Sequence, residues 1–239
     1  MLLAVSAGVH ALAVKADEGQ PIHVLVDGST EMPQAELRNG RVVGGLQHDL
    51  AQEFGRRLQR PVLFRLVPRR RVAQWLAAGE QADLICNFAP AWLPGPLLWS
   101  QPFLQAADVL ITASRRTAPR RIEELAGQPI GTIAGFHYPE VEAALGSGFV
   151  RDDATDLPGS LRKLAVGRVD HALVVSANFD YLRKQGQVQV ELHPPLPVAR
   201  LRTGCALSPH SRVTLVQLDA AIAAMQADGS LVRILDRYR

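Results

Sequence analysis

Hydrophobic residues recur along the chain in two alternating rhythms, which predict strands and helices in turn. The run Ile22-His23-Val24-Leu25-Val26-Asp27 is typical of a buried strand, and Gly28-Ser29 ends it. After a polar stretch that reaches Gly44-Gly45, apolar residues return every four positions, which predicts a helix with one buried face. The first part of the chain therefore reads β-α-β-α-β, an order that builds a parallel sheet covered by helices. The later elements of this cycle are predicted as a helix over 46–58, a strand over 62–67, a helix over 68–79 and a strand over 83–87.

A second cycle of the same kind follows a segment rich in proline. Residues 87–105 hold several prolines and two tryptophans, which predict an irregular loop. No linker rich in Ser or Gly separates the two cycles, so we expect two lobes that share a hinge. The first lobe is predicted to contain residues 20–113 and 201–239, and the second residues 114–200. Within 106–239 we expect strands over 107–113, 129–133, 169–175, 188–192 and 202–206, and helices over 122–125, 138–145, 161–166, 176–185, 211–227 and 230–238.

Composition is that of an ordinary folded protein. Of the 239 residues, 47% are hydrophobic and 21% charged, which suits two α/β lobes. The net charge of +3 comes from arginines that are scattered apart from the run Arg69-Arg70-Arg71. Because aromatic residues are only 5% and no nucleic-acid-reading motif occurs, we expect no nucleic-acid partner. No internal stretch approaches the ~20 apolar residues that a membrane-spanning helix needs.

The N-terminal segment and the two cysteines bear on the cellular compartment. Residues 1–16 are almost all apolar and offer small residues for cleavage, so we expect a signal peptide that lacks its basic start and a periplasmic location. The alternative is a buried first strand or helix. Cys86 and Cys205 are compatible with a disulfide in an exported protein or with two buried free thiols, and both interpretations stay open.

Six short segments follow one another in an order that is known from one class of proteins. Together they resemble the type II periplasmic solute-binding proteins, in particular the family of the polar amino-acid receptors of ABC importers (bacterial extracellular solute-binding protein family 3). The chain looks like a divergent member of that family, and the resemblance runs from Ile22 nearly to the C-terminus. The segments are Gly45-Leu46-Gln47-His48-Asp49-Leu50-Ala51, Leu76-Ala77-Ala78-Gly79 with Ala82-Asp83-Leu84, Trp99-Ser100-Gln101-Pro102-Phe103, Leu125-Ala126-Gly127-Gln128-Pro129-Ile130-Gly131, Gly167-Arg168-Val169-Asp170 and Asp228-Gly229-Ser230-Leu231.

The resemblance implies an α/β fold of two lobes, each a central, mostly parallel sheet flanked by helices, with the ligand cleft between the lobes. It implies a monomeric, non-enzymatic receptor without a cofactor, which captures a small solute by lobe closure and presents it to the membrane permease of an ABC importer. Two alternatives stay open. The chain would serve as the ligand-binding partner of a sensor protein, or as a dehydratase-like lyase that uses Glu31, His137 or Asp156.

The chain departs from the family at the residues that hold an amino acid. The family's arginine, which pairs with the ligand carboxylate, is absent from the loop 87–95, and Val175-Ser176 stand where an Asp would hold the α-ammonium group. The ligand is therefore not expected to be an ordinary α-amino acid. Arg69, at the start of a predicted helix, is either a replacement that binds an anion or part of a solvated arginine cluster.

In such folds the ligand lies at the carboxyl ends of the strands, a rule that nominates candidates in both lobes. Trp92 and Phe136 offer flat faces on which a solute can stack. Backbone donors at Gly135-Phe136-His137 would assist Arg69 if the ligand is an anion. The predicted ligand-binding residues are Asp27, Glu31, Met32, Arg69, Asn87, Phe88, Trp92, Gly135, Phe136, His137, Tyr138, Asp156 and Ser176.

Overall fold

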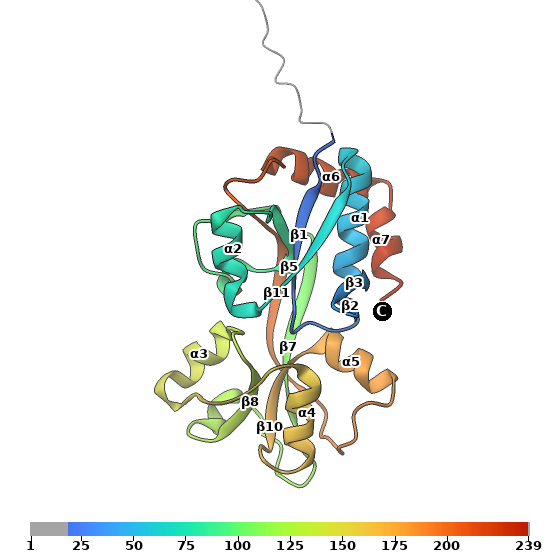
Figure 1. The fold of residues 1–239 in the computed structure, drawn as a ribbon. Coiled ribbons are helices and arrows are strands. Elements are labelled where there is room, and N and C mark those ends of the chain that lie inside the picture. Colours follow the sequence, from blue (N-terminus) through green and yellow to red (C-terminus); the bar gives the residue numbers. More distant parts are fainter. Residues whose placement is uncertain (1–18, 239) are drawn as a thin grey trace, which may run out of the picture.

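The computed structural model describes residues 19–238, so the predicted signal segment 1–16 lies outside the described residues. The described chain forms two lobes, one above the other in Figure 1, joined by two long strands. The upper lobe holds β1 (Ile22–Asp27), β2 (Glu36–Arg38), β3 (Arg41–Gly44), α1 (Leu46–Leu58), β4 (Val62–Val67), α2 (Val72–Ala78), β5 (Leu84–Phe88), β6 (Leu98–Trp99), α6 (Leu215–Ala227) and α7 (Ser230–Leu235). The lower lobe holds β8 (Pro129–Ile133), α3 (Pro139–Leu145), β9 (Val150–Ala154), α4 (Leu157–Ala165), β10 (His171–Val175) and α5 (Ser176–Lys184).

Strand alternation places a hydrophobic core on each face of the upper sheet. Val24 of β1 and Leu84 of β5 pack with α1, α6 and α7, whereas Leu25 and Ile85, one residue further on, pack with α2. Successive side chains of a strand point to opposite faces, so strands covered on both sides are nearly all apolar. Figure 1 shows α2 on one side of the sheet and α1 with α7 on the other.

The lower sheet is built in the same way. Ile111 of β7 and Val174 of β10 pack with α4 and α5, whereas Leu110 and Leu173 pack with α3. The strand order is β4-β1-β5-β11-β7-β10-β8-β9, in which β1 pairs in parallel with β4 and β5, and β8 in parallel with β9 and β10. Each lobe therefore has its own two-sided core, as the two predicted cycles require.

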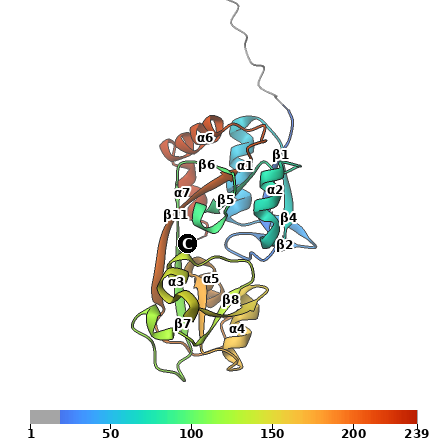
Figure 2. The same ribbon diagram turned by 90° about the vertical axis from the view of Figure 1, so that its left-hand side faces the viewer.

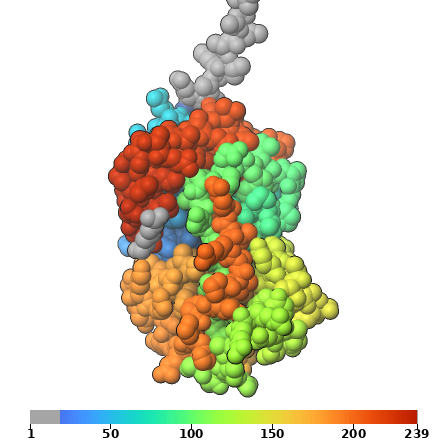
Figure 3. All heavy atoms as spheres, turned by 180° about the vertical axis from the view of Figure 1, so that it is seen from behind, coloured from blue at the N-terminus to red at the C-terminus, as the bar shows by residue number. Residues whose placement is uncertain are grey.

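Two antiparallel strands, β7 (Leu104–Thr112) and β11 (Leu196–Leu207), connect the lobes. They pair from Leu104 and Thr203 at the upper end to Leu110 and Leu196 at the lower end. Figure 2 shows both strands running from one lobe to the other along one side of the molecule. In the space-filling view of Figure 3, the orange part of the chain that leads into β11 spans the waist.

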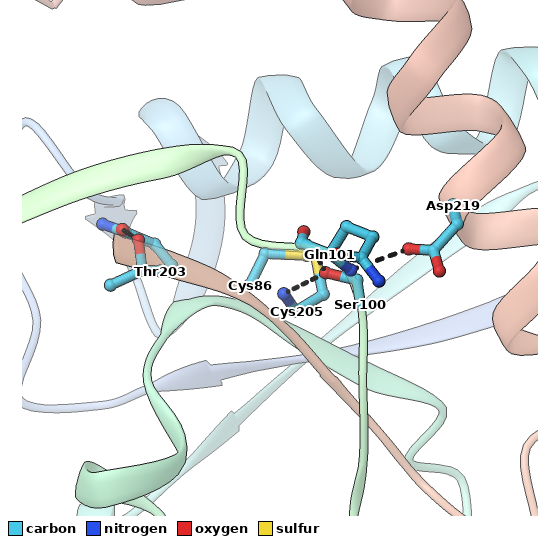
Figure 4. Close-up of a disulfide and its surroundings, with 7 residues drawn as sticks. Cys86, Ser100, Gln101, Thr203, Cys205 and Asp219 are labelled. Atoms are coloured by element: carbon cyan, nitrogen blue, oxygen red, sulfur yellow. Dashed lines mark hydrogen bonds between the residues drawn. A yellow bond between two sulfur atoms is a disulfide. The ribbon is translucent and has the colours of Figure 1, made fainter. Parts of the chain in front are cut away.

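The two cysteines form a disulfide at the upper end of this connection (Figure 4). Cys86 of β5 and Cys205 of β11 are direct partners on neighbouring antiparallel strands. Beside them, the Ser100 hydroxyl accepts the Cys205 N–H at 2.9 Å, and the Gln101 N–H donates to the Asp219 carboxylate of α6 at 2.9 Å. The disulfide, one of the two interpretations left open by the sequence, thus fixes the upper end of β11 to the first lobe.

The structure departs from several predicted elements. Residues 188–192 are not a strand: only Leu192 forms a bridge, to Ala113, because the apolar side chains of this segment pack onto the lower core instead of entering a ladder. The polar stretch before α1 contains the hairpin of β2 and β3, and the charged edge strand β9 was missed. The helix predicted from about 211 begins only at Leu215, where Thr214 and Gln217 form a capping box.

The segment 87–105 is mostly irregular, as expected, with a short 3-10 helix at Pro90–Trp92 and the two-residue strand β6. The arginine run forms a second 3-10 helix, Arg69–Arg71, which precedes α2. Gly79 ends α2 in the left-handed conformation, as predicted. No helix within residues 19–238 is long and apolar enough to cross a membrane.

Candidate functional site

A cavity of about 90 Å³ lies between the lobes at the carboxyl ends of β1, β5 and β8. This volume suits several water molecules or one small solute. Both lobes line it, and most of its surface is apolar. Nine of the predicted ligand-binding residues lie in its wall: Asp27, Glu31, Arg69, Asn87, Phe88, Trp92, Phe136, His137 and Tyr138.

The four other predicted residues lie elsewhere. Asp156 lines a second, wider recess of about 490 Å³ that shares Ser29 and Arg69 with the cavity. Its carboxylate accepts the Gly159 N–H at 2.7 Å and caps α4. Met32, Gly135 and Ser176 are not in the wall of either recess. For all thirteen, ligand contact stays a prediction.

The Arg69 guanidinium is held by the protein itself. Its Cζ lies 4.5 Å from the centre of the Phe88 ring in the first lobe and 4.9 Å from that of Phe136 in the second. Its Nη2 donates to the Trp92 carbonyl at 3.0 Å, and its Nε lies 3.9 Å from Asp27 Oδ2. Burial lowers the pKa of Arg69, while the charge of Asp27 raises it again. Stacked between two aromatic rings, this cation joins the lobes across the cleft.

The side chain of Asn87, like that of Arg69, has its partners within the protein. Its backbone takes the left-handed conformation at the end of β5, with a φ of 62°. Its side-chain amide donates to Gln34 Oε1 at 2.7 Å and accepts from the Thr203 hydroxyl at 2.6 Å. Asn87 therefore ties β5 to β11 and to the loop after β1, where Glu31 and Gln34 lie.

In contrast to Arg69 and Asn87, whose partners lie within the protein, two carboxyl groups in the cavity wall have no cationic partner within residues 19–238. Asp108, on β7, is 3% exposed, and no hydrogen bond or salt bridge from residues 19–238 reaches its carboxylate. Burial, helped by the negative charge of Glu140, raises the pKa of Asp108 to about 7. Burial also raises the pKa of Glu31 to about 8, helped by the charges of Asp156 and Asp27 and opposed by a hydrogen bond with Asn178. Both groups are poised to respond to a charge that enters the cavity.

The lobes also meet through the backbone. Gly135, after β8, has a φ of +82°, and a Cβ added there would lie 2.9 Å from Cγ of Arg70 and 3.1 Å from Cγ of Arg69. Asn178 of α5 donates to the Glu31 carbonyl across the cleft at 3.4 Å. A glycine at position 135 therefore permits the close approach of the second lobe to the arginines of the first.

Sequence reasoning missed six polar residues of the cavity wall: Ser29, Thr30, Gln34, Gln47, Asp108 and Asn178. Asp108 carried a signal, because it is the single charged residue inside the predicted strand 107–113. The rule used to choose candidates looked at strand ends, whereas Asp108 lies in the middle of a strand that crosses from one lobe to the other. Gln47 and Asn178 lie on helices and gave no such signal. Within residues 19–238, no cluster of His, Cys, Asp and Glu could hold a metal ion.

No protein-family model and no curated protein matches the chain. Solved structures match it over most of its length. The substrate-binding protein of an amino acid ABC transporter is 14% identical with a TM-score of 0.70, over 91% of this chain and 98% of that chain. A histidine kinase sensor domain with similarity to periplasmic binding proteins is 18% identical with a TM-score of 0.76, over 90% of this chain and 94% of that chain. An ancestral amino-acid-binding protein, a precursor of cyclohexadienyl dehydratase, is 16% identical with a TM-score of 0.74, over 91% and 95%.

The chain has the two-lobed fold of the periplasmic binding proteins. The predicted fold class is thereby confirmed, with the cavity in the cleft between the lobes. At these sequence identities the likeness extends to the fold alone. What this binding-protein fold does in the present chain must be argued from its own cleft.

Proposed function

We propose that the chain is an exported solute-binding protein that closes its lobes around one small solute. The observation that carries this proposal is the buried cavity, which both lobes line and in which several polar groups lack a partner. Ligands bind to such two-lobed folds by stabilising the closed arrangement, which a membrane partner then recognises. In this proposal the protein acts as a monomer that delivers its solute to the permease of an ABC importer. Its lobes are residues 20–113 with 201–239, and residues 114–200.

Two observations support export and transport. The Cys86–Cys205 disulfide suits an oxidising compartment such as the periplasm, because cytosolic proteins seldom keep structural disulfides. The fold is shared with a substrate-binding protein of an amino acid ABC transporter. Membership of the polar amino-acid receptor family, as a divergent member, is part of the same proposal.

The proposed ligand is not an ordinary α-amino acid. The loop 87–95 contains no arginine for a ligand carboxylate, and Val175-Ser176 offer no carboxylate for an α-ammonium group. The idea that Arg69 binds an anion loses support from the structure. An incoming anion would compete with Asp27 and the Trp92 carbonyl for the guanidinium, and it would lie in a cavity that also holds Glu31 and Asp108.

Specific observations favour two further functions. The fold is shared with a histidine kinase sensor domain, which supports the alternative of a ligand-binding partner in sensing. The raised pKa of Glu31, about 8, is that of a group able to donate a proton near neutral pH, which supports the enzyme alternative. A bound solute that is recovered unchanged would exclude turnover for that solute.

The proposal is tested by a thermal-shift screen of the mature protein against amines, amino acids, organic acids, sugars and aromatic acids. A solute at a hundred times its dissociation constant stabilises the protein by about 2.7 kcal/mol, which is visible as a higher melting temperature. We expect a hit in one class, accompanied in small-angle X-ray scattering by a more uniformly compact molecule. No hit in any class would contradict the proposed function.

A further inference from the structure

Unpaired polar atoms of the described side chains concentrate in one place. Four buried side-chain atoms within residues 19–238 have no hydrogen-bond partner: Gln47 Oε1, Trp92 Nε1, Asn178 Oδ1 and Ser160 Oγ. The first three belong to residues that line the cavity between the lobes, whereas Ser160 lies outside it. Buried polar groups are almost always paired in folded proteins, so a cluster of exceptions indicates missing partners from a ligand.

Most of these groups accept hydrogen bonds rather than donate them. Gln47 Oε1 and Asn178 Oδ1 are amide oxygens, and the orientation of Asn178 follows from its nitrogen, which donates to the Glu31 carbonyl. Asp108 adds a buried carboxylate that no donor from residues 19–238 reaches. Trp92 Nε1 is the one buried side-chain nitrogen of the described wall without a partner, and the Tyr138 hydroxyl accepts the Ile133 N–H but donates to no residue within 19–238. The missing partner must therefore supply several N–H donors.

The charged residues of the cavity wall also favour a cationic ligand. Its buried cation, Arg69, is already stacked between Phe88 and Phe136 and paired with Asp27. The exposed His137 lies 3.9 Å from Glu142, outside the buried set. Glu31 and Asp108 are left without a positive partner, and a buried carboxylate is stable in its charged form only beside a cation. A solute with a positive charge would satisfy both carboxylates.

We propose that the cavity binds a small primary amine, with Glu31 and Asp108 as its anionic partners and the side-chain oxygen of Gln47 or Asn178 as the third acceptor for its ammonium group. This inference rests on the proposed solute-binding function and names its ligand class. The apolar body of the amine lies against Leu157, Leu173 and the ring of Phe88. A volume of about 90 Å³ favours a short alkyl body over a larger one.

A primary amine carries no carboxylate that the cavity would have to bind, in contrast to an amino acid. A ligand carboxylate would require several donors and would lie in a cavity whose wall already holds the carboxyl groups of Glu31 and Asp108. Without a nearby cation, the pKa of Glu31 is raised to about 8 and that of Asp108 to about 7. A bound ammonium group would favour the ionised form of both carboxyl groups and would lower both pKa values.

The test compares ligands that differ only in their charged group, by isothermal titration calorimetry of the mature protein at pH 8. One set is benzylamine, benzyl alcohol, benzoate and phenylglycine; the other is butylamine, putrescine, butanol and butyrate. We expect an amine to bind, with its matched alcohol and carboxylate at least tenfold weaker. Absence of binding by every amine at millimolar concentration, or tighter binding of a carboxylate, would overturn the proposal.

Variants separate a binding role from a structural one. We expect Asp108→Asn and Glu31→Gln to weaken amine binding at least tenfold while the melting temperature of the empty protein stays the same or rises. Glu123→Gln, at an exposed carboxylate of the second lobe, serves as the matched control and should bind like the unmodified protein. Unchanged amine affinity in both cavity variants would also overturn the proposal.

The outcomes distinguish the ligand class from the function. If a sugar or an organic acid from the broader screen binds while the amines do not, the amine proposal fails and the solute-binding function stands. If no class binds, both fail.

Discussion

Two parts of the same cleft treat their buried charges in opposite ways. On the Arg69 side, which we call the complete side, the charge has partners within the protein: the guanidinium lies between two aromatic rings, donates to a carbonyl and faces the Asp27 carboxylate, and the Asn87 amide is used on both its oxygen and its nitrogen. The Asp108 side is incomplete, with Asp108, Gln47 and Asn178 lacking partners. The complete side holds the lobes together, and the incomplete side is where a solute can add binding energy.

The largest predicted change in stability comes from removing the buried cation of the complete side, Arg69. Arg69→Ala should lower the free energy of unfolding by about 3–5 kcal/mol, because it leaves the buried Asp27 without its cation. The measurement is urea unfolding, with Arg71→Ala, an exposed neighbour in the same run, as the control. A loss no larger than that of the control would contradict a stabilising role for Arg69.

A methyl group placed between the lobes tests whether the complete side closes the cleft. In Gly135→Ala the new Cβ would collide with the stems of Arg69 and Arg70, so we expect the lobes to move apart and solute affinity to fall about tenfold. Small-angle X-ray scattering should report a larger radius of gyration.

Gly127→Ala is the matched control for this variant. Gly127 also has a positive φ, +78°, in the second lobe, but a Cβ there would meet no atom within 4 Å. Both variants carry the backbone cost of a left-handed alanine, about 1–2 kcal/mol. Only Gly135→Ala should change the scattering, and equal changes in the two variants would contradict a closing contact at Gly135.

A further prediction concerns how the stability of the empty protein depends on pH. The pKa of Asp108 is raised from 3.8 to about 7 in the folded protein, so the folded state binds more protons than the unfolded chain between these values. The contribution of Asp108 to stability is therefore complete below about pH 4 and is lost as the pH rises through 7. Relative to the unmodified protein, Asp108→Asn should gain about 2–3 kcal/mol more in free energy of unfolding at pH 8 than at pH 5, because about two pH units of proton binding separate the two conditions.

Because other groups also titrate, this prediction concerns the difference in stability between Asp108→Asn and the unmodified protein at each pH. Glu31 adds loss of stability up to about pH 8, whereas the lowered pKa of His171, a consequence of burial, adds stability as the pH rises through 6.5. Both contributions cancel when the variant is compared with the unmodified protein at each pH. A constant difference between pH 5 and pH 8 would show that Asp108 is ionised in the empty cleft.

Nine of the thirteen predicted residues line the cavity between the lobes, and their contact with a ligand stays a prediction. The rule of carboxyl strand ends led to Asp27, Glu31, Phe88 and Phe136, all of which line the cavity. Arg69 was found by its position at a helix start, but its partners Phe88 and Phe136 come from opposite lobes and no sequence spacing joins them. Asp108 was overlooked because the rule considered strand ends only, whereas Asp108 lies in the middle of β7, which connects the lobes and lines the cavity.

Local patterns determined the elements of this protein. Alternating apolar residues in β1 and fourfold spacing in α1 are set by the backbone geometry of strands and helices, so they can be recognised without a partner. The same patterns misassigned residues 188–192, where alternating apolar residues pack onto a core instead of pairing in a sheet. Tertiary structure alone decided which polar groups found partners, because that depends on residues far apart in sequence meeting at fixed distances. Arg69 was satisfied in this way and Asp108 was not, and that difference decides the charge of the proposed ligand.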